Sequence, residues 1–179
     1  SKQRAIRGGV SENIALRIHR ALSWLKRAEQ EQNDPDACYI FLWIAFNAAY
    51  ADERDIEQST KTSYSDFFRK IEALDCERRI YGAVWNKFSG PIRTLLNNQY
   101  VYAGFWRHHN GICGYSDWQE RFKRDTQKTH RAISKQDTAT ILSLVFDRLY
   151  VLRNQLLHGG ATWDSSVNRA QVKDGAAIL

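Results

Sequence analysis

The sequence has little proline, since only Pro35 and Pro91 occur in 179 residues. Proline is the residue that most reliably interrupts a helix, so long helices are allowed over most of the chain. No segment alternates apolar and polar residues like a half-buried strand, and no repeat with a period of about 20 to 50 residues is present. These absences exclude a β-rich or repetitive architecture and favour an all-α helical bundle.

Cysteine is also scarce. Cys38, Cys76 and Cys113 are widely spaced and form no C-x-x-C pair, which excludes a disulfide framework and a cysteine-rich zinc site. His108 and His109 precede Cys113 in one segment, but no regularly spaced set of further ligands accompanies them, as a four-ligand zinc site requires. We therefore expect no metal, no cofactor, and a reducing, cytoplasmic setting.

Long apolar runs are missing as well. The longest, from Tyr39 to Ala51, contains Asn47 and is shorter than the roughly 20 residues needed to span a bilayer. Residues 1–9 are basic but lack the apolar stretch of an export signal. We expect a soluble protein that makes no membrane contact.

What the sequence does contain is an excess of positive charge. Lys and Arg number 26 against 20 Asp and Glu, which gives a formal net charge of +6. The two signs are unevenly distributed, because most charged residues of 1–31 are basic and most charged residues of 34–57 are acidic. An excess of this kind favours a polyanionic partner.

Hydrophobic periodicity, caps and breaks predict the organisation of the chain. We expect an N-terminal arm over 1–10, one helical domain over 11–160 and a mobile C-terminal tail over 161–179. The predicted helices cover 11–32, 37–50, a third starting at Ser63 or Ser65 and passing Leu74, a fourth including Ile80, Val84 and Trp85, another from Pro91, then 118–133, and a last one from a cap at Asp137 to Gly159-Gly160. We interpret 97–118, which is rich in glycine and aromatic residues, as a structured loop or a broken helix.

The last helix carries the most informative polar residues. Its apolar positions form one broad arc at 100° per residue, and Arg153 falls within that arc. Asn154 and His158 are four residues apart and share the adjacent, more polar face with Asp147. Two alternatives stay open here: Arg153 is an internal ion-pair partner of Glu29 or Asp147, or His158 only complements the carbonyl groups of the helix end.

The segment Arg153-Asn154-Gln155-Leu156-Leu157-His158 resembles the hallmark of the HEPN superfamily, an arginine and a histidine separated by four to six residues near the end of the last helix. Residues 21–28 and 41–50 look like the first two helices of an Apea-like branch of these domains. Residues 52–134 align with nothing known to us. The resemblance implies an all-α bundle of the HEPN type with an elaborated middle region.

Active HEPN proteins are metal-independent endoribonucleases that leave a 2′,3′-cyclic phosphate and combine the motifs of two domains across a homodimer. The resemblance implies that His158 transfers protons, that Arg153 stabilises charge on the phosphorus, and that Asn154 orients the phosphate or His158. It also implies a toxin, defence or stress-response setting, in which a protein regulator is expected. The alternative is a non-catalytic HEPN module that binds nucleotide, RNA or a protein partner. A third function is that of a structural dimerisation domain.

Further residues are candidates for RNA binding. Aromatic and cationic side chains are dense between 100 and 118, and such a surface stacks unpaired bases and contacts phosphates. The candidates are Trp106, Arg107, His108 and His109. Core packing and dimer contacts are the alternative for at least half of this segment. Asn47, inside the apolar second helix, is either a supporting residue of the site or a structural hydrogen-bond partner.

Overall fold

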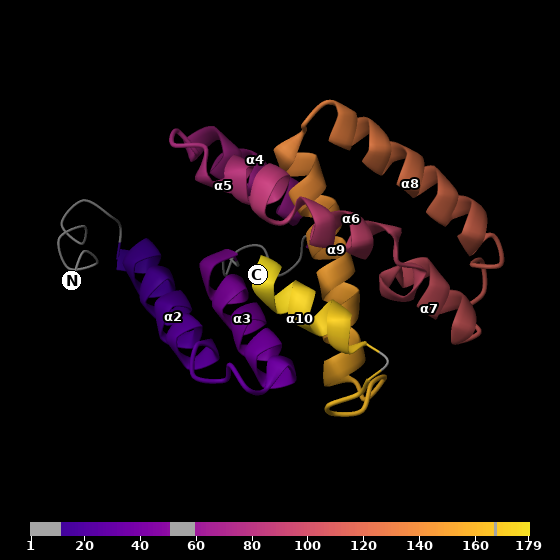
Figure 1. The fold of residues 1–179 in the computed structure, drawn as a ribbon, viewed down its shortest axis with the longest axis horizontal. Coiled ribbons are helices and arrows are strands. Elements are labelled where there is room, and N and C mark those ends of the chain that lie inside the picture. The colour runs from indigo at the N-terminus through magenta and orange to yellow at the C-terminus, as the bar shows by residue number, and fades with distance from the viewer. Residues whose placement is uncertain (1–11, 51–59, 167) are drawn as a thin grey trace. The chain divides into compact units, whose positions relative to one another are not determined.

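The computed structural model describes residues 12–50, 60–166 and 168–179. These residues form nine α-helices, one π turn and one 3-10 turn, and no strand (Figure 1). The predicted all-α helical bundle is confirmed. The predicted N-terminal arm, residues 1–10, lies outside the described residues.

The described chain divides into two compact units. Unit 1 holds residues 12–50 together with 161–177 and 179, and unit 2 holds residues 60–160 and 178. This division differs from the predicted single domain over 11–160, because the first two helices cluster with the C-terminal segment.

Unit 1 begins with α2 (Glu12–Ala28) and α3 (Pro35–Tyr50), two helices in mutual contact. Asp34 caps α3, since its carboxylate accepts hydrogen bonds from the backbone N–H groups of Asp36 and Ala37, both at 3.1 Å. The predicted break and cap before the second helix are therefore confirmed. The first helix ends before the predicted residue 32.

The C-terminal segment of unit 1 contains a helix, α10 (Arg169–Ile178), where the sequence predicts a mobile tail. Val172 is fully buried. The guanidinium of Arg169 forms an ion pair with the buried Asp36 at 2.9 Å, and Asp36 also accepts a hydrogen bond from the backbone N–H of Asp164 at 2.9 Å. An ion pair and a buried valine thus hold the segment predicted to be a tail within unit 1.

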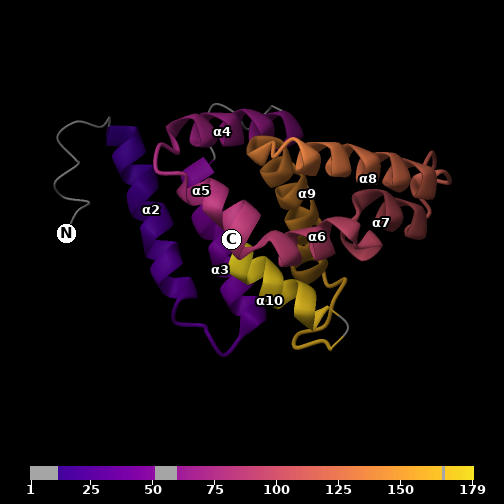
Figure 2. The ribbon, with the colours of Figure 1, turned by 45° about the horizontal axis from the view of Figure 1, so that its top comes forward.

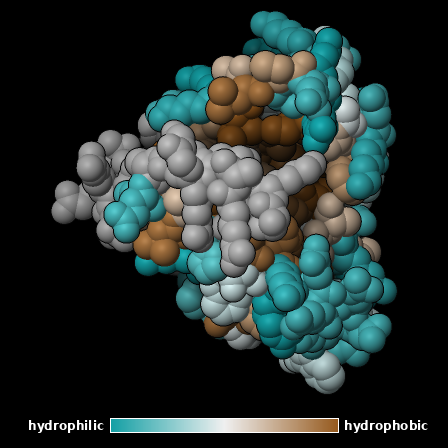
Figure 3. Space-filling view, turned by 90° about the vertical axis from the view of Figure 1, so that its left-hand side faces the viewer, coloured by the Kyte–Doolittle hydropathy of each residue, from teal (hydrophilic) through white to brown (hydrophobic). Residues whose placement is uncertain are grey.

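Helix α2 differs from its prediction in burial. The expected apolar face is present, yet Ala28 is the one residue of α2 that is fully buried. Figure 3 views the molecule from the side on which Figure 1 draws α2, and apolar residues in brown reach the surface there among polar ones. The exposed apolar side chains of α2 are Ile14, Leu16, Ile18, Leu22, Trp24 and Leu25.

Unit 2 is built around its last helix. Figures 1 and 2 show this helix, α9, running through the unit, and it contacts α4, α6, α8 and η4. The elements are α4 (Thr60–Leu74), α5 (Arg79–Gly82), the π turn η3 (Ala83–Lys87), α6 (Ser89–Asn97), the 3-10 turn η4 (Gln99–Val101), α7 (Ala103–His109), α8 (Trp118–Ser134) and α9 (Thr138–Leu157).

The core of unit 2 follows the apolar arc of α9. Ile141, Val145, Leu149 and Leu152 are fully buried. Phe146 contacts α4 through the ring of Phe68, with centroids 4.8 Å apart. Because these residues recur at intervals of three and four, the arc predicted from the sequence is confirmed over most of the helix.

The starts of two helices differ from prediction. Helix α4 begins at Thr60, so Ser63 and Ser65 lie inside it and do not cap it. Helix α6 begins at Ser89, two residues before Pro91, which is still within the first turn, where proline is tolerated.

The glycine-rich stretch after α6, predicted to be a structured loop or a broken helix, is a broken helix. It consists of η4 and α7 followed by turns. Gly104 is needed where it stands, because a Cβ there would lie 2.6 Å from a ring carbon of Tyr102. The glycine therefore allows the ring of Tyr102 to lie against α7.

Candidate functional site

Helix α9 ends where the sequence predicts. The side chain of Asp137 caps its start by accepting a hydrogen bond from the backbone N–H of Thr140 at 3.0 Å. The last helical residue is Leu157, His158 is the C-cap, and Gly159 has a φ of 72°, the left-handed conformation that glycine adopts readily. His158 is exposed. The imidazole is thus accessible at a sharply terminated helix end.

Arg153 and Asn154 are in direct contact one turn before this end. Both side chains are half-buried, and Nη1 of Arg153 donates a hydrogen bond to Oδ1 of Asn154 at 2.9 Å. The guanidinium carbon lies 5.6 Å from the centroid of the Tyr150 ring. Asn154 therefore orients Arg153. The resemblance implied instead that Asn154 orients the phosphate or His158.

The burial of Arg153 differs from the prediction that places it inside the apolar arc. Leu152 is fully buried, but Leu156 is half-buried and Leu157 is 47% exposed, so the arc opens to the surface over the last turn. Within the described residues Arg153 makes no ion pair. The internal ion pair that a purely structural role predicts is not found there.

A single carbonyl group links the end of α9 to the aromatic segment. The backbone oxygen of Tyr100 accepts a hydrogen bond from Nε2 of Gln155 at 2.7 Å and another from Nε1 of Trp106 at 2.6 Å. Gln155 belongs to α9 and follows Asn154 directly, whereas Trp106 belongs to α7. The two predicted groups of site residues, far apart in the sequence, are therefore neighbours in unit 2.

The supporting residues of α7 divide between surface and packing. Arg107, His108 and His109 are exposed, and Trp106 is half-buried. Arg107 hydrogen-bonds to the hydroxyl of Tyr115. The imidazole of His109 is parallel to a neighbouring phenylalanine ring at 5.9 Å. Packing thus accounts for part of this segment and leaves three cationic or imidazole side chains at the surface.

Asn47 belongs to the other unit. It lies in α3 of unit 1 and is half-buried. The site is accordingly built from residues of unit 2, namely Arg153, Asn154, His158 and the side chains of α7.

The most buried charged residue of α9 was not predicted from the sequence. Arg148 is only 7% exposed, and its guanidinium carbon lies 4.5 Å from the ring centroid of Tyr102 and 5.5 Å from that of Phe122. Its Nε has no hydrogen-bond partner. Burial lowers the pKa of Arg148, and the nearby Tyr102 and Asp125 oppose this shift. The sequence signal that could have indicated this burial is its position three residues after Val145, which places Arg148 on the same side of the helix.

Tyr102 connects this arginine to α8. Its hydroxyl donates a hydrogen bond to Oδ2 of Asp125 at 3.0 Å. Burial, reinforced by this hydrogen bond and by the charge of Asp125, raises the pKa of Tyr102 to about 12. The phenol is therefore neutral beside Arg148 at physiological pH and contributes a ring face and a hydrogen-bond donor.

The described residues contain no group of three or more His, Cys, Asp or Glu side chains placed to hold a metal ion. None of the described helices combines the length and apolar character needed to cross a membrane.

Comparison with known proteins gave no match. No family model matches the chain, and no matching curated protein or solved structure was found. The function is therefore inferred from the residues of the chain and from the resemblance of the segment 153–158.

Proposed function

We propose that the protein is a metal-independent endoribonuclease of the HEPN type, acting in the cytoplasm as a homodimer. The observation that carries the proposal is the double hydrogen bond to the carbonyl of Tyr100, which brings the surface of α7 next to the helix end that bears Arg153, Asn154 and His158. This arrangement combines a polar end of α9 with aromatic and cationic side chains suited to unpaired RNA.

In the proposed reaction the 2′-oxygen of a ribose attacks the adjacent phosphorus. The new bond joins the 2′-oxygen to phosphorus, and the bond from phosphorus to the 5′-oxygen breaks, which leaves a 2′,3′-cyclic phosphate and a free 5′-hydroxyl. His158 of one protomer accepts the proton of the 2′-hydroxyl, and His158 of the other donates a proton to the 5′-oxygen. An imidazole is suited to both roles because it takes up and releases protons near neutral pH.

Arg153 stabilises the negative charge that develops on the phosphoryl oxygens. A guanidinium presents several donors in a fixed plane, and donors directed at developing charge lower the barrier most. The hydrogen bond from Arg153 to Asn154 fixes the direction of one of these donors. Asn154 is therefore a positioning residue in this mechanism.

The direct test is cleavage of a labelled, unstructured RNA in the presence of a chelator. We expect the wild type to release products that end in a 2′,3′-cyclic phosphate, and His158→Ala to be slower by about 10² to 10⁴-fold, the usual contribution of proton transfer. His19→Ala is the control, because His19 is likewise exposed but lies in α2. Equal cleavage by wild type and His158→Ala contradicts the mechanism. RNA binding without cleavage identifies a non-catalytic module instead.

A further inference from the structure

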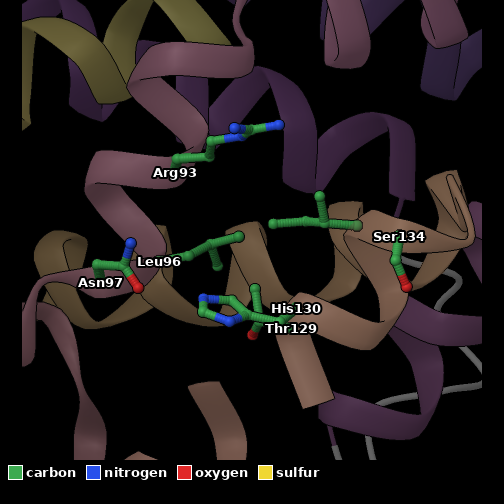
Figure 4. A pocket seen from close by; sticks show the side chains of 7 residues that line it. Arg93, Leu96, Asn97, Thr129, His130 and Ser134 are labelled. Atoms are coloured by element: carbon green, nitrogen blue, oxygen red, sulfur yellow. The ribbon is translucent and has the colours of Figure 1, made fainter. Parts of the chain in front are cut away.

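Unit 2 has an open groove between α6 and α8, and no residue of the segment 153–158 lines it. Its volume is about 320 Å³, near the lower end of the range for small-molecule sites. Figure 4 shows side chains from both helices around it. Helix α6 contributes Arg93, Leu96 and Asn97, and helix α8 contributes Thr129, His130, Ile133 and Ser134.

The inner wall of the groove is apolar. Leu96 is 2% exposed and Ile133 is half-buried. The hydroxyl groups of Thr129 and Ser134 donate hydrogen bonds to carbonyl oxygens of their own helix, each at 2.9 Å. Since these donors are already used within α8, the wall favours an apolar surface of a ligand.

The rim of the groove is polar. Arg93, Asn97 and His130 are exposed, and none of them makes a side-chain hydrogen bond or ion pair with another described residue. In Figure 4 Leu96 lies between Arg93 and His130, so the groups with unused hydrogen-bonding capacity border the apolar wall. No Asp or Glu lines the groove. The rim therefore favours an anion.

The charge of the rim distinguishes between kinds of anion. Arg93 is the one permanent cation in the lining. A carboxylate carries a single negative charge and two oxygens that match the planar donors of a guanidinium. A phosphate monoester carries a charge of about −1.5 to −2 and three acceptor oxygens. The charge of a single guanidinium therefore matches a carboxylate better than it matches a phosphate monoester.

We propose that the groove binds a small aromatic carboxylate. The carboxylate pairs with Arg93, and the ring lies against Leu96 and Ile133. Asn97 and His130 hydrogen-bond to a polar substituent at the edge of the ring, since an amide both donates and accepts and an imidazole nitrogen does either. This proposal depends only on residues of α6 and α8, and so it does not require the proposed ribonuclease activity.

The test is a calorimetric titration of the full chain with 4-hydroxybenzoate, together with its neutral counterpart 4-hydroxybenzamide and with phenyl phosphate. We expect saturable binding of the carboxylate, at least about tenfold weaker binding of the amide, and no preference for the phosphate, because the charge-assisted hydrogen bonds to the guanidinium provide most of the affinity. The same titration with Arg93→Gln should show a loss of about tenfold or more.

Two further variants test whether the ligand binds in the groove or is attracted by the general positive charge of the protein. Arg124→Gln removes an exposed cation of α8 that does not line the groove, and it should bind as the wild type does. Ser134→Phe places a ring at the groove without removing a charge, and it should abolish binding. Absence of binding to the wild type at millimolar concentration overturns the proposal. So does an equal loss in Arg93→Gln and Arg124→Gln, unchanged binding in Ser134→Phe, or a clear preference for phenyl phosphate.

Discussion

Two arginines of α9 lie five positions apart in the sequence and in very different surroundings. Arg148 is buried, and its guanidinium lies against the rings of Tyr102 and Phe122. Arg153 is half-buried near the open end of the helix and donates a hydrogen bond to Asn154. The same side chain thus packs into the core of unit 2 at one position and lies near the exposed helix end at the other. On this comparison, stability should depend on Arg148 and RNA cleavage on Arg153.

The largest expected effect on stability comes from Arg148→Ala. This change removes a buried side chain with its contacts to two rings, so we expect the free energy of unfolding to fall by about 2 to 3 kcal/mol. Arg153→Ala should cost less than about 1 kcal/mol, because the side chain lies where the apolar arc opens to the surface. Urea denaturation of both variants measures the difference. Equal losses would remove the distinction between the two positions.

The next largest effect concerns the orientation of Arg153. Asn154→Ala removes the acceptor of its 2.9 Å hydrogen bond. On the proposed function we expect RNA cleavage to slow by about tenfold, since a hydrogen bond to a charged group contributes about 1.5 to 3 kcal/mol and part of it is replaced by water. Asn86→Ala, at an exposed asparagine of η3, is the matched control, and it should cleave RNA at the wild-type rate. A cleavage rate unchanged in Asn154→Ala would show that Asn154 does not position the arginine.

The surroundings of Arg148 should also appear in the alkaline dependence of stability. The pKa of Tyr102 is raised from 10.0 to about 12 by burial first and by its hydrogen bond to Asp125. The pKa of Tyr102 is thus higher in the folded state than in the unfolded state. The stability that the neutral phenol contributes is therefore complete below about pH 10 and is lost as the pH rises through about 12. Tyr102→Phe should be less stable than the wild type by about 1 kcal/mol at pH 8. Denaturation of both proteins across the alkaline range should show this difference shrinking, whereas a difference independent of pH would contradict the assigned cause.

The smallest expected effect lies at the contact between the two groups of site residues. Gln155→Ala removes one of the two hydrogen bonds to the carbonyl of Tyr100. The carbonyl keeps its bond from Trp106, so we expect a loss of only about 0.5 kcal/mol in the free energy of unfolding. Hydrogen exchange at the backbone N–H groups of 101–106 should rise in this variant. Unchanged exchange would mean that the contact does not hold α7 against α9.

Local signals predicted much of the fold. The caps at Asp34 and Asp137 and the left-handed Gly159 mark helix ends by chemistry that acts within a few residues. The helix α10 gave no comparable signal. Val172 is buried and Arg169 is paired with Asp36, more than a hundred residues away in the sequence. Such an interaction is tertiary and leaves no trace in local periodicity.

The candidate site was predicted only in part, because its remaining features also depend on tertiary packing. Periodicity assigns both Arg148 and Arg153 to the neighbourhood of the apolar arc. Which of them is buried depends on how far Tyr102 and α8 cover the helix, and that is determined by packing rather than by spacing. Likewise, the sequence predicts residues 100–118 as a candidate surface, but the carbonyl of Tyr100 that joins this segment to α9 is apparent only from the fold.

The most direct test of the account compares RNA cleavage by Arg148→Met and Arg153→Met in chelator, at a temperature where both variants are folded. Methionine keeps much of the packing volume and removes the charge, and replacing a buried charge by an apolar residue is often neutral for stability. The account predicts that Arg148→Met cleaves about as fast as the wild type and that Arg153→Met is slower by about 10² to 10³-fold. Wild-type cleavage by Arg153→Met, or equal losses in the two variants, would contradict it.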